Sequence, residues 1–224
     1  MMKIIRQHLK NNLQSDIWKN KRCFLIGGGP SLIDFNPKLL KNELTIGVNK
    51  AFIKFNPTIN YSMDPNFQKF LSKEPCSALT SVQEQWRNYK GVKVFLKTSS
   101  KYIYNKNIFL IQRIRDKRKI SYDPNIGIIP GKCSGFGALM LAISLGCKEI
   151  YLLGYDLDVQ NNLTHWHEGY KNQTIEKCLH RLKRFKANFN EYSEILRNEG
   201  IQIVNLNLDS KLECFPKDSI ENIL

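Results

Sequence analysis

Short apolar runs alternate with longer polar or amphipathic stretches along the chain. We predict β-strands at residues 23–28, 44–49, 59–64, 92–97, 107–112, 149–156 and 201–207. Several of these runs are apolar at consecutive positions, which is typical of strands covered by helices on both faces. Their alternation with helical stretches favours a Rossmann-like α/β fold, that is, a doubly wound, mostly parallel sheet with helices on both faces.

Two segments carry clear helical patterns. Residues 134–146 are apolar nearly all round, so this helix should lie buried against the sheet, with Ser134 as its N-cap and Gly146 as its C-cap. In the second segment, about 172–198, apolar residues recur at spacings of three and four from Ile175 to Leu196. This spacing predicts one continuous apolar face, with lysine and arginine mostly on the other faces.

We expect one domain over residues 1–224, because the chain contains neither an internal repeat nor a low-complexity linker. Residues 66–130 look less regular than the rest. They include the basic run RIRDKRK (113–119) and the turn-rich stretch SYDPNIGIIPG (121–131). We interpret this region as a lid or as loops on the acceptor side of a site.

A glycine-rich turn, GGGPSL, follows the first predicted strand. A strand that leads through such a turn into a helix directs amide N–H groups and the helix dipole at an anion. Glycines permit positive φ and leave no Cβ to obstruct a phosphate. We therefore predict a nucleotide-binding turn, although neither a Walker A loop nor the full dinucleotide fingerprint is present. Its residues are Gly27, Gly28, Gly29, Pro30 and Ser31.

The next two predicted strands end in polar residues, Asn49 and Asp64. In open α/β sheets, ligands bind outside the carboxyl ends of the strands. Asn49 and Asp64 are therefore candidates for holding ribose hydroxyls or a base edge, although both also belong to ordinary turn sequences.

The densest candidate chemistry lies in residues 132–170. Asp156 and Asp158 are two residues apart, so in an extended backbone both would project to one side, where they could approach hydroxyls or, in a metal-dependent enzyme, Mg²⁺ or Mn²⁺. His165 and His167 share the same spacing, and an imidazole suits proton abstraction from a hydroxyl.

The formal net charge is +14, with 34 Lys and Arg against 20 Asp and Glu. Such an excess suits an anionic partner such as DNA, an acidic glycan, a membrane surface or simply a nucleotide substrate, although an AT-rich coding sequence would also produce it. The six cysteines form no C-x-x-C pair, which argues against a zinc or redox motif. We expect neither a signal peptide nor a transmembrane segment, and hence a cytoplasmic protein.

Two related groups share the motifs GGGPSL and SGFGALMLAISLGCKEIYLLGYDLD. The chain resembles the bacterial sialyltransferases of glycosyltransferase family 42 and the MptE-like group, and the continuation THWHEGY is similar to short phage-encoded members of the latter. The resemblance covers roughly half of the chain and implies a Rossmann-like nucleotide-binding domain.

The resemblance also implies roles for particular residues. It assigns the nucleotide of a sugar donor to Gly27–Ser31, Asn49 and Asp64, although the sialyltransferases have Asn where this chain has Asp64. It makes His167 or His165 the general base. The helix start at Ser134 and Gly135, together with Asp156, would complete the nucleotide site, and Lys132 could neutralise the departing phosphate. Tyr155 and Tyr170 are candidates for assisting that departure.

Three functions follow from these observations. The leading hypothesis is a glycosyltransferase that moves a sugar from a nucleotide-sugar donor to a hydroxyl, such as that of a modified base in phage DNA. The first alternative is an MptE-like diphosphokinase that uses ATP and Mg²⁺ on a pterin-type substrate. The second is a non-catalytic nucleotide-binding phage accessory protein.

Overall fold

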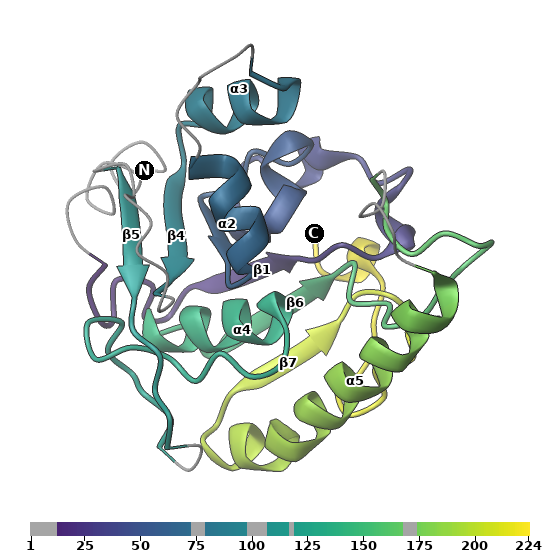
Figure 1. Cartoon of the computed structure of the whole chain (residues 1–224). Coiled ribbons are helices and arrows are strands. Elements are labelled where there is room, and N and C mark those ends of the chain that lie inside the picture. The colour runs from purple at the N-terminus through teal and green to yellow at the C-terminus, as the bar shows by residue number, and fades with distance from the viewer. Residues whose placement is uncertain (1–12, 73–78, 98–106, 117–118, 168–173) are drawn as a thin grey trace.

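Seven parallel strands form the sheet in the computed structural model, which describes residues 13–72, 79–97, 107–116, 119–167 and 174–224 (Figure 1). Each of these strands overlaps one predicted from the sequence. Their bounds are β1 Arg22–Ile26, β2 Leu44–Val48, β3 Ile59–Ser62, β4 Val92–Leu96, β5 Ile108–Ile111, β6 Glu149–Leu153 and β7 Gln202–Asn205. The fold is the Rossmann-like α/β arrangement expected from the sequence.

The strands lie in the order β5-β4-β3-β2-β1-β6-β7. From β1 the chain builds the sheet outward through β5 on one side, then crosses back and places β6 on the other side of β1. The order therefore reverses between β1 and β6. Ligands of open α/β sheets bind at such a switch point, outside the carboxyl ends of the strands.

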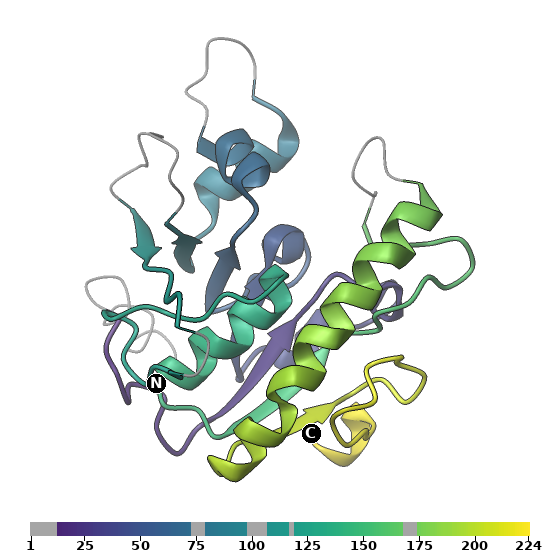
Figure 2. The same cartoon turned by 60° about the horizontal axis from the view of Figure 1, so that its bottom comes forward.

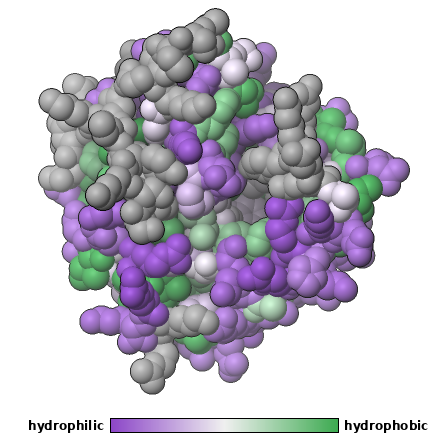
Figure 3. All heavy atoms as spheres, in the orientation of Figure 1, coloured by the Kyte–Doolittle hydropathy of each residue, from purple (hydrophilic) through white to green (hydrophobic). Residues whose placement is uncertain are grey.

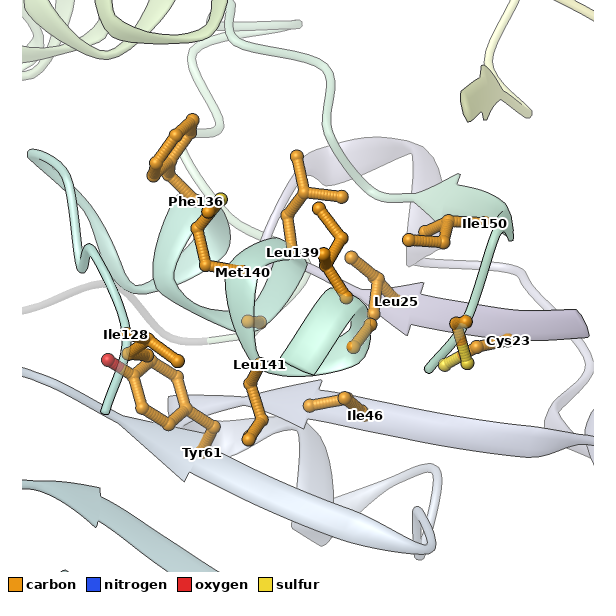
Figure 4. Packing of buried hydrophobic residues seen from close by; sticks show 14 of the residues in the cluster. Cys23, Leu25, Ile46, Tyr61, Ile128, Phe136, Leu139, Met140, Leu141 and Ile150 are labelled. Carbon is orange, nitrogen blue, oxygen red and sulfur yellow. The ribbon is translucent and has the colours of Figure 1, made fainter. Parts of the chain in front are cut away.

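Side chains of β1 alternate between two hydrophobic layers, as the period of a strand requires. Cys23 and Leu25 face one layer, while Phe24 and Ile26 face the other. The helices α4 (Ser134–Ser144) and α5 (Ile175–Asn198) cover the first layer (Figure 2). Figure 4 shows side chains of α4, such as Leu139 and Leu141, packed toward the strands. This packing confirms that the 134–146 segment is a buried helix.

Short helices cover the opposite face. They include the 3-10 helices η1 (Pro30–Leu32), η2 (Pro37–Leu40), η3 (Asn49–Ile53) and η4 (Ile220–Asn222) and the α-helices α2 (Pro65–Ser72) and α3 (Ser81–Asn88). Both α2 and α3 lie at the start of the 66–130 region, where the sequence analysis expected a lid or acceptor-side loops and no helix. α3 begins with a capping box between Thr80 and Gln83, a signal that the sequence did contain.

The start of α4 differs from the prediction. Cys133, not Ser134, is the N-cap, and its Sγ accepts a hydrogen bond from the N–H of Phe136 over 3.4 Å. Ser134 is instead the first residue of the helix. At the other end Gly146 follows the last turn with a φ of +96°, the left-handed conformation that favours glycine.

α5 is only partly embedded in the core. Phe189, Tyr192 and Leu196 are buried, whereas Ile175 and Leu179 are 39% and 38% exposed. The apolar face predicted over the whole helix therefore contacts the core in its second half only. The first half extends beyond the sheet (Figures 1 and 2). No helix of the described residues has the length and apolar character needed to cross a membrane.

Candidate active site

A cavity of about 350 Å³ opens at the carboxyl ends of the strands, on the switch point between β1 and β6. It joins segments that are far apart in the sequence: the glycine turn after β1, the starts of η3 and α2, the start of α4, the loop after β6, and the first half of α5. The predicted site residues that line it are Gly27, Gly28, Gly29, Asn49, Asp64, Lys132, Ser134, Gly135, Tyr155, Asp158, His165 and His167. Pro30, Ser31 and Asp156 are not among the lining residues.

The amides of the glycine turn are mostly committed to the protein itself. The N–H of Gly27 donates to the carbonyl oxygen of Leu153 (2.7 Å), and the N–H of Gly29 donates to that of Gly154 (2.8 Å). The turn leads into the three-residue 3-10 helix η1 rather than into an α-helix. It therefore does not supply the row of free amides and the helix dipole that the sequence analysis predicted.

Absence of a Cβ, rather than positive φ, explains these glycines. Gly27, Gly28 and Gly29 are not in the left-handed region. A Cβ at Gly27 would lie 2.5 Å from the carbonyl oxygen of Gly154, and one at Gly29 would lie 2.4 Å from Cγ of Asp156. Only at Gly28 would the Cβ face the cavity side, 3.0 Å from Cδ2 of His165. Two of the three glycines thus allow close packing against the segment after β6.

The start of α4 is the part of the cavity wall whose electrostatics best suit an anion. An α-helix of this length carries a partial positive charge at its N-terminus, and Cys133, Ser134 and Gly135 line the cavity there. Lys132 precedes them, is exposed, and adds a cation. Burial raises the pKa of the Cys133 thiol to about 11, so this residue stays neutral at physiological pH.

Asn49 and Asp64 lie on the β2–β3 side of the cavity and also hold the local backbone. Oδ1 of Asn49 accepts a hydrogen bond from the hydroxyl of Ser62 over 2.7 Å, and Asn49 itself has a φ of +52°. Oδ1 of Asp64 accepts from the N–H of Asn66 (2.9 Å) and caps the start of α2. Each side chain therefore combines a structural contact with a place on the cavity wall.

Asp156 and Asp158 do not share the cavity. Leu157 between them has a φ of +48°, so the backbone is not extended there and the two carboxylates do not project to one side. Asp158 lines the cavity, whereas Asp156 is fully buried behind the glycine turn. Both oxygens of Asp156 accept hydrogen bonds from Ser31, and one also accepts from Asn207. The pair therefore does not fit a shared divalent cation.

His165 and His167 lie together on the cavity wall. Their rings are stacked with centroids 5.0 Å apart. Trp166 between them anchors the loop, because its backbone N–H donates to the carbonyl oxygen of Gly28 (3.1 Å) and its indole N–H donates to that of Gly27 (3.3 Å). The glycine turn and the histidine segment thus meet directly, as the sequence hypothesis required.

The two histidines differ in environment. Burial, reinforced by the nearby His167, Arg181 and Lys50, lowers the pKa of His165 to about 4. The imidazole of His165 is therefore neutral at physiological pH, and Nδ1 forms a hydrogen bond with the hydroxyl of Thr164 over 2.8 Å. A group with so low a pKa is a weak base, which leaves His167 as the better candidate for proton abstraction.

Several cavity residues were missed by the sequence analysis. Arg181, Leu182 and Phe185 of α5 line the cavity. The helical spacing placed Leu182 and Phe185 on an apolar face, but nothing in the sequence showed that this part of the face meets a cavity instead of the core. Asn207, after β7, does not line the cavity but donates to Asp156, and it carried no recognisable signal either.

Of the two candidate tyrosines, Tyr155 is buried under the start of α4. Its hydroxyl donates to the carbonyl oxygen of Gly135 over 3.0 Å, and burial raises its pKa well above the usual value. Tyr170 lies outside the described residues.

Comparison with known proteins gives one informative likeness. The sequence matches neither a family model nor a curated protein. The structure is similar to that of the sialyltransferase CstII from Campylobacter jejuni, which was solved in complex with the substrate analogue CMP-3FNeuAc. The TM-score is 0.51 and the sequence identity 14%, over 88% of this chain and 85% of that one. The chain thus has a Rossmann-like fold of the kind found in a glycosyltransferase.

Proposed function

We propose that this protein is a glycosyltransferase that transfers a sugar from a nucleotide-sugar donor to a hydroxyl acceptor. The observation that carries the proposal is the cavity at the switch point, where the start of α4 and the His165–His167 segment converge. A likeness in fold to a sialyltransferase solved with a CMP-sugar analogue supports the same reaction class. Fold alone does not determine a reaction, whereas the residues that line the site bear on it directly.

In the proposed complex, the donor phosphate lies at the N-terminus of α4. The partial charge of the helix and the ammonium group of Lys132 stabilise the negative charge that develops as the sugar leaves. The nucleoside lies toward Gly28, Asn49 and Asp64, which line the same cavity. We assign to Asp64 a contact through the carboxylate oxygen that does not cap α2.

His167 is the proposed general base. It takes the proton from the acceptor hydroxyl as the hydroxyl oxygen attacks the anomeric carbon, and the bond from that carbon to the phosphate oxygen breaks. His165 is held neutral beside it, so the stacked pair does not place two positive charges in contact before the reaction. Asp158 also lines the cavity, and we assign its carboxylate to orienting the acceptor.

The diphosphokinase alternative requires ligands for Mg²⁺. Among the described residues no group of three or more His, Cys, Asp or Glu side chains could hold a metal ion, and Asp156 is engaged by Ser31 and Asn207. The residues of this site therefore fit a phosphate held by amides and cations better than one held through a protein-bound cation.

Calorimetric titration of the purified protein with CMP, UDP, GDP and ATP, each with and without Mg²⁺, tests the proposal. We expect one nucleotide of the type found in sugar donors to bind without Mg²⁺, and the corresponding nucleotide-sugar to be hydrolysed slowly or transferred. Selective binding of ATP with Mg²⁺ would instead favour the diphosphokinase. Binding of a nucleotide without turnover of any donor would favour the accessory-protein hypothesis.

For the acceptor, we propose duplex DNA carrying a hydroxylated base. The first half of α5 leads out of the cavity, and five of its twelve residues (175–186) are Lys or Arg against one Glu. Hydrophilic side chains gather over this helix on the face seen in Figure 3. The exposed cations of this half are Lys177, Lys183 and Arg184, and Arg181 lines the cavity itself.

Titration of a fluorescent duplex at increasing NaCl measures this contact. We expect affinity to fall linearly on a log–log plot with a slope near −0.9 for each phosphate contacted. The charge-reversing variant Lys177→Glu/Arg184→Glu should reduce both the affinity and the slope. Lys41→Glu serves as the control, because Lys41 is an exposed lysine at the end of η2, which packs on the opposite face of the sheet from α5. Salt-independent or undetectable binding would exclude DNA as the acceptor.

A further inference from the structure

We propose that Asp156 is a positioning residue which, together with Asn207, holds the glycine turn in the shape that borders the ligand cavity. The proposal rests on the function above only in treating that cavity as the nucleotide site. It replaces the expectation that Asp156 touches a nucleotide or a metal.

Ser31 gives both of its hydrogen-bond donors to this one carboxylate. Its backbone N–H donates to Oδ2 of Asp156 over 2.8 Å, and its hydroxyl donates to Oδ1 over 2.5 Å. Such a two-point contact fixes the orientation of the peptide as well as its position. The residue that ends the glycine turn is therefore tied to the end of β6, 125 residues away.

Asn207 completes the arrangement from the next strand. Its Nδ2 donates to Oδ1 of Asp156 over 2.9 Å, and the backbone carbonyl of Asp156 accepts from the N–H of Lys211 over 2.8 Å. The segments that follow β1, β6 and β7, three neighbours in the sheet, are thereby joined through one residue.

The burial of Asp156 makes these donors indispensable. The residue is fully buried, and no ion pair to it is found within the described part of the chain. A buried carboxylate is costly unless hydrogen bonds replace its hydration. A ligand that took the Ser31 hydroxyl would leave Oδ1 with only the Asn207 amide as a donor, so we assign Ser31 to holding the turn and not to the nucleotide.

Gly29 fits the same interpretation. A Cβ at this position would lie 2.4 to 2.6 Å from the three carboxylate atoms of Asp156. The third glycine of the motif therefore leaves room for the Asp156 carboxylate, and this carboxylate fixes the glycine turn through its hydrogen bonds to Ser31. All three glycines line the cavity, but only at Gly28 would a Cβ meet a side chain of the cavity wall, His165, and no backbone atom or Asp156.

Asp156→Asn tests the proposal. The amide keeps the size of the side chain, but its NH2 group replaces one carboxylate oxygen and then faces a hydrogen-bond donor of Ser31 or Asn207. Hydrogen–deuterium exchange of the unliganded full chain should show faster exchange in the peptides that cover residues 27–33. With a nucleotide-sugar donor, KM should rise about tenfold or more while kcat changes less than threefold, since the base and the α4 N-terminus are unaffected. Asp209→Asn, an exposed carboxylate in the segment after β7, is the matched control.

Ser31→Ala provides a second test that does not depend on the stability of the Asp156 variant. It should speed exchange at residues 27–33 and raise KM, as Asp156→Asn does. The double variant should have the same exchange rates and KM as Asp156→Asn alone, because both substitutions disrupt the same Ser31–Asp156 contact. Unchanged exchange at 27–33 in both variants, or independent and multiplicative effects on KM, would overturn the proposal. Faster exchange in a protein whose wild type binds no nucleotide would support the positioning role and refute the proposed function.

Discussion

The backbone N–H of Trp166 donates a hydrogen bond to the carbonyl oxygen of Gly28 over 3.1 Å, joining two segments that lie 138 positions apart. The indole N–H of the same tryptophan reaches the carbonyl oxygen of Gly27, and its ring packs edge-on against Phe55 with centroids 5.7 Å apart. Through this residue the histidine loop is fastened to the glycine turn, and one cavity has both as walls.

We expect Trp166→Phe to keep most of the packing but lose the indole hydrogen bond, at a cost of about 1 kcal/mol. Trp166→Ala also removes the ring and should cost more and loosen the loop. Chemical denaturation measures the first effect, and amide exchange in residues 160–167 measures the second. Equal exchange rates in Trp166→Ala and the wild type would show that the loop does not depend on this anchor.

His167→Ala should lower turnover of a nucleotide-sugar donor about 10²- to 10⁴-fold while leaving nucleotide affinity nearly unchanged, as expected for loss of a general base. The control is His180→Ala, since His180 is an exposed histidine on α5. Initial rates with the donor, together with calorimetric titration of the nucleotide, separate the two quantities. Full activity of His167→Ala would remove its assignment as the base.

Stability should depend on pH through His165. Its pKa is about 4 in the folded protein against 6.5 when unperturbed, so the unfolded chain binds a proton that the folded protein does not between these values. The neutral form thus contributes stability that is complete above pH 6.5 and is lost as pH falls toward 4, by up to about 3 kcal/mol.

Urea denaturation at pH 7.0 and at pH 4.5 measures this loss. His165→Gln cannot titrate, so it should lose less stability than the wild type over the same interval. The same pH dependence in both proteins would mean that other groups cause it.

Gly27→Ala and Gly28→Ala should have different consequences. The first places a Cβ 2.5 Å from the carbonyl oxygen of Gly154 and must displace backbone next to β6, so we expect it to cost about 1–3 kcal/mol. The second meets the side chain of His165 at 3.0 Å, so the fold should tolerate it while the cavity narrows. Thermal denaturation and nucleotide titration measure the two effects, and the reverse order of stabilities would contradict our account of the turn.

Much of the fold was predictable from the sequence because the pattern of apolar positions reports local structure directly. Strands buried on both faces, such as 23–28 and 149–156, appear as continuous apolar runs, and the all-apolar 134–146 segment becomes the buried helix α4. α2 and α3 were missed because they are eight-residue helices with few apolar positions.

The chemistry of the site was less accessible. The sequence identified His165 and His167 by residue type and placed them after a strand, and both line the cavity. It could not show that Asp158 lines the cavity while Asp156 is buried behind the glycine turn. The two carboxylates have the same sequence pattern, and they are separated by the left-handed backbone at Leu157, which the sequence does not reveal.

The sequence by itself determined the strands, the buried helix and the presence of a tight glycine turn, since these follow from hydrophobic periodicity and from the small size of glycine. Only the tertiary structure decided what each polar group faces. The strand order brings β1, β6 and β7 together, so the N–H groups of Gly27, Gly29 and Ser31 donate to Leu153, Gly154 and Asp156. The start of α4 lines the cavity instead. Partners separated by more than a hundred residues are set by packing, and local sequence does not encode them.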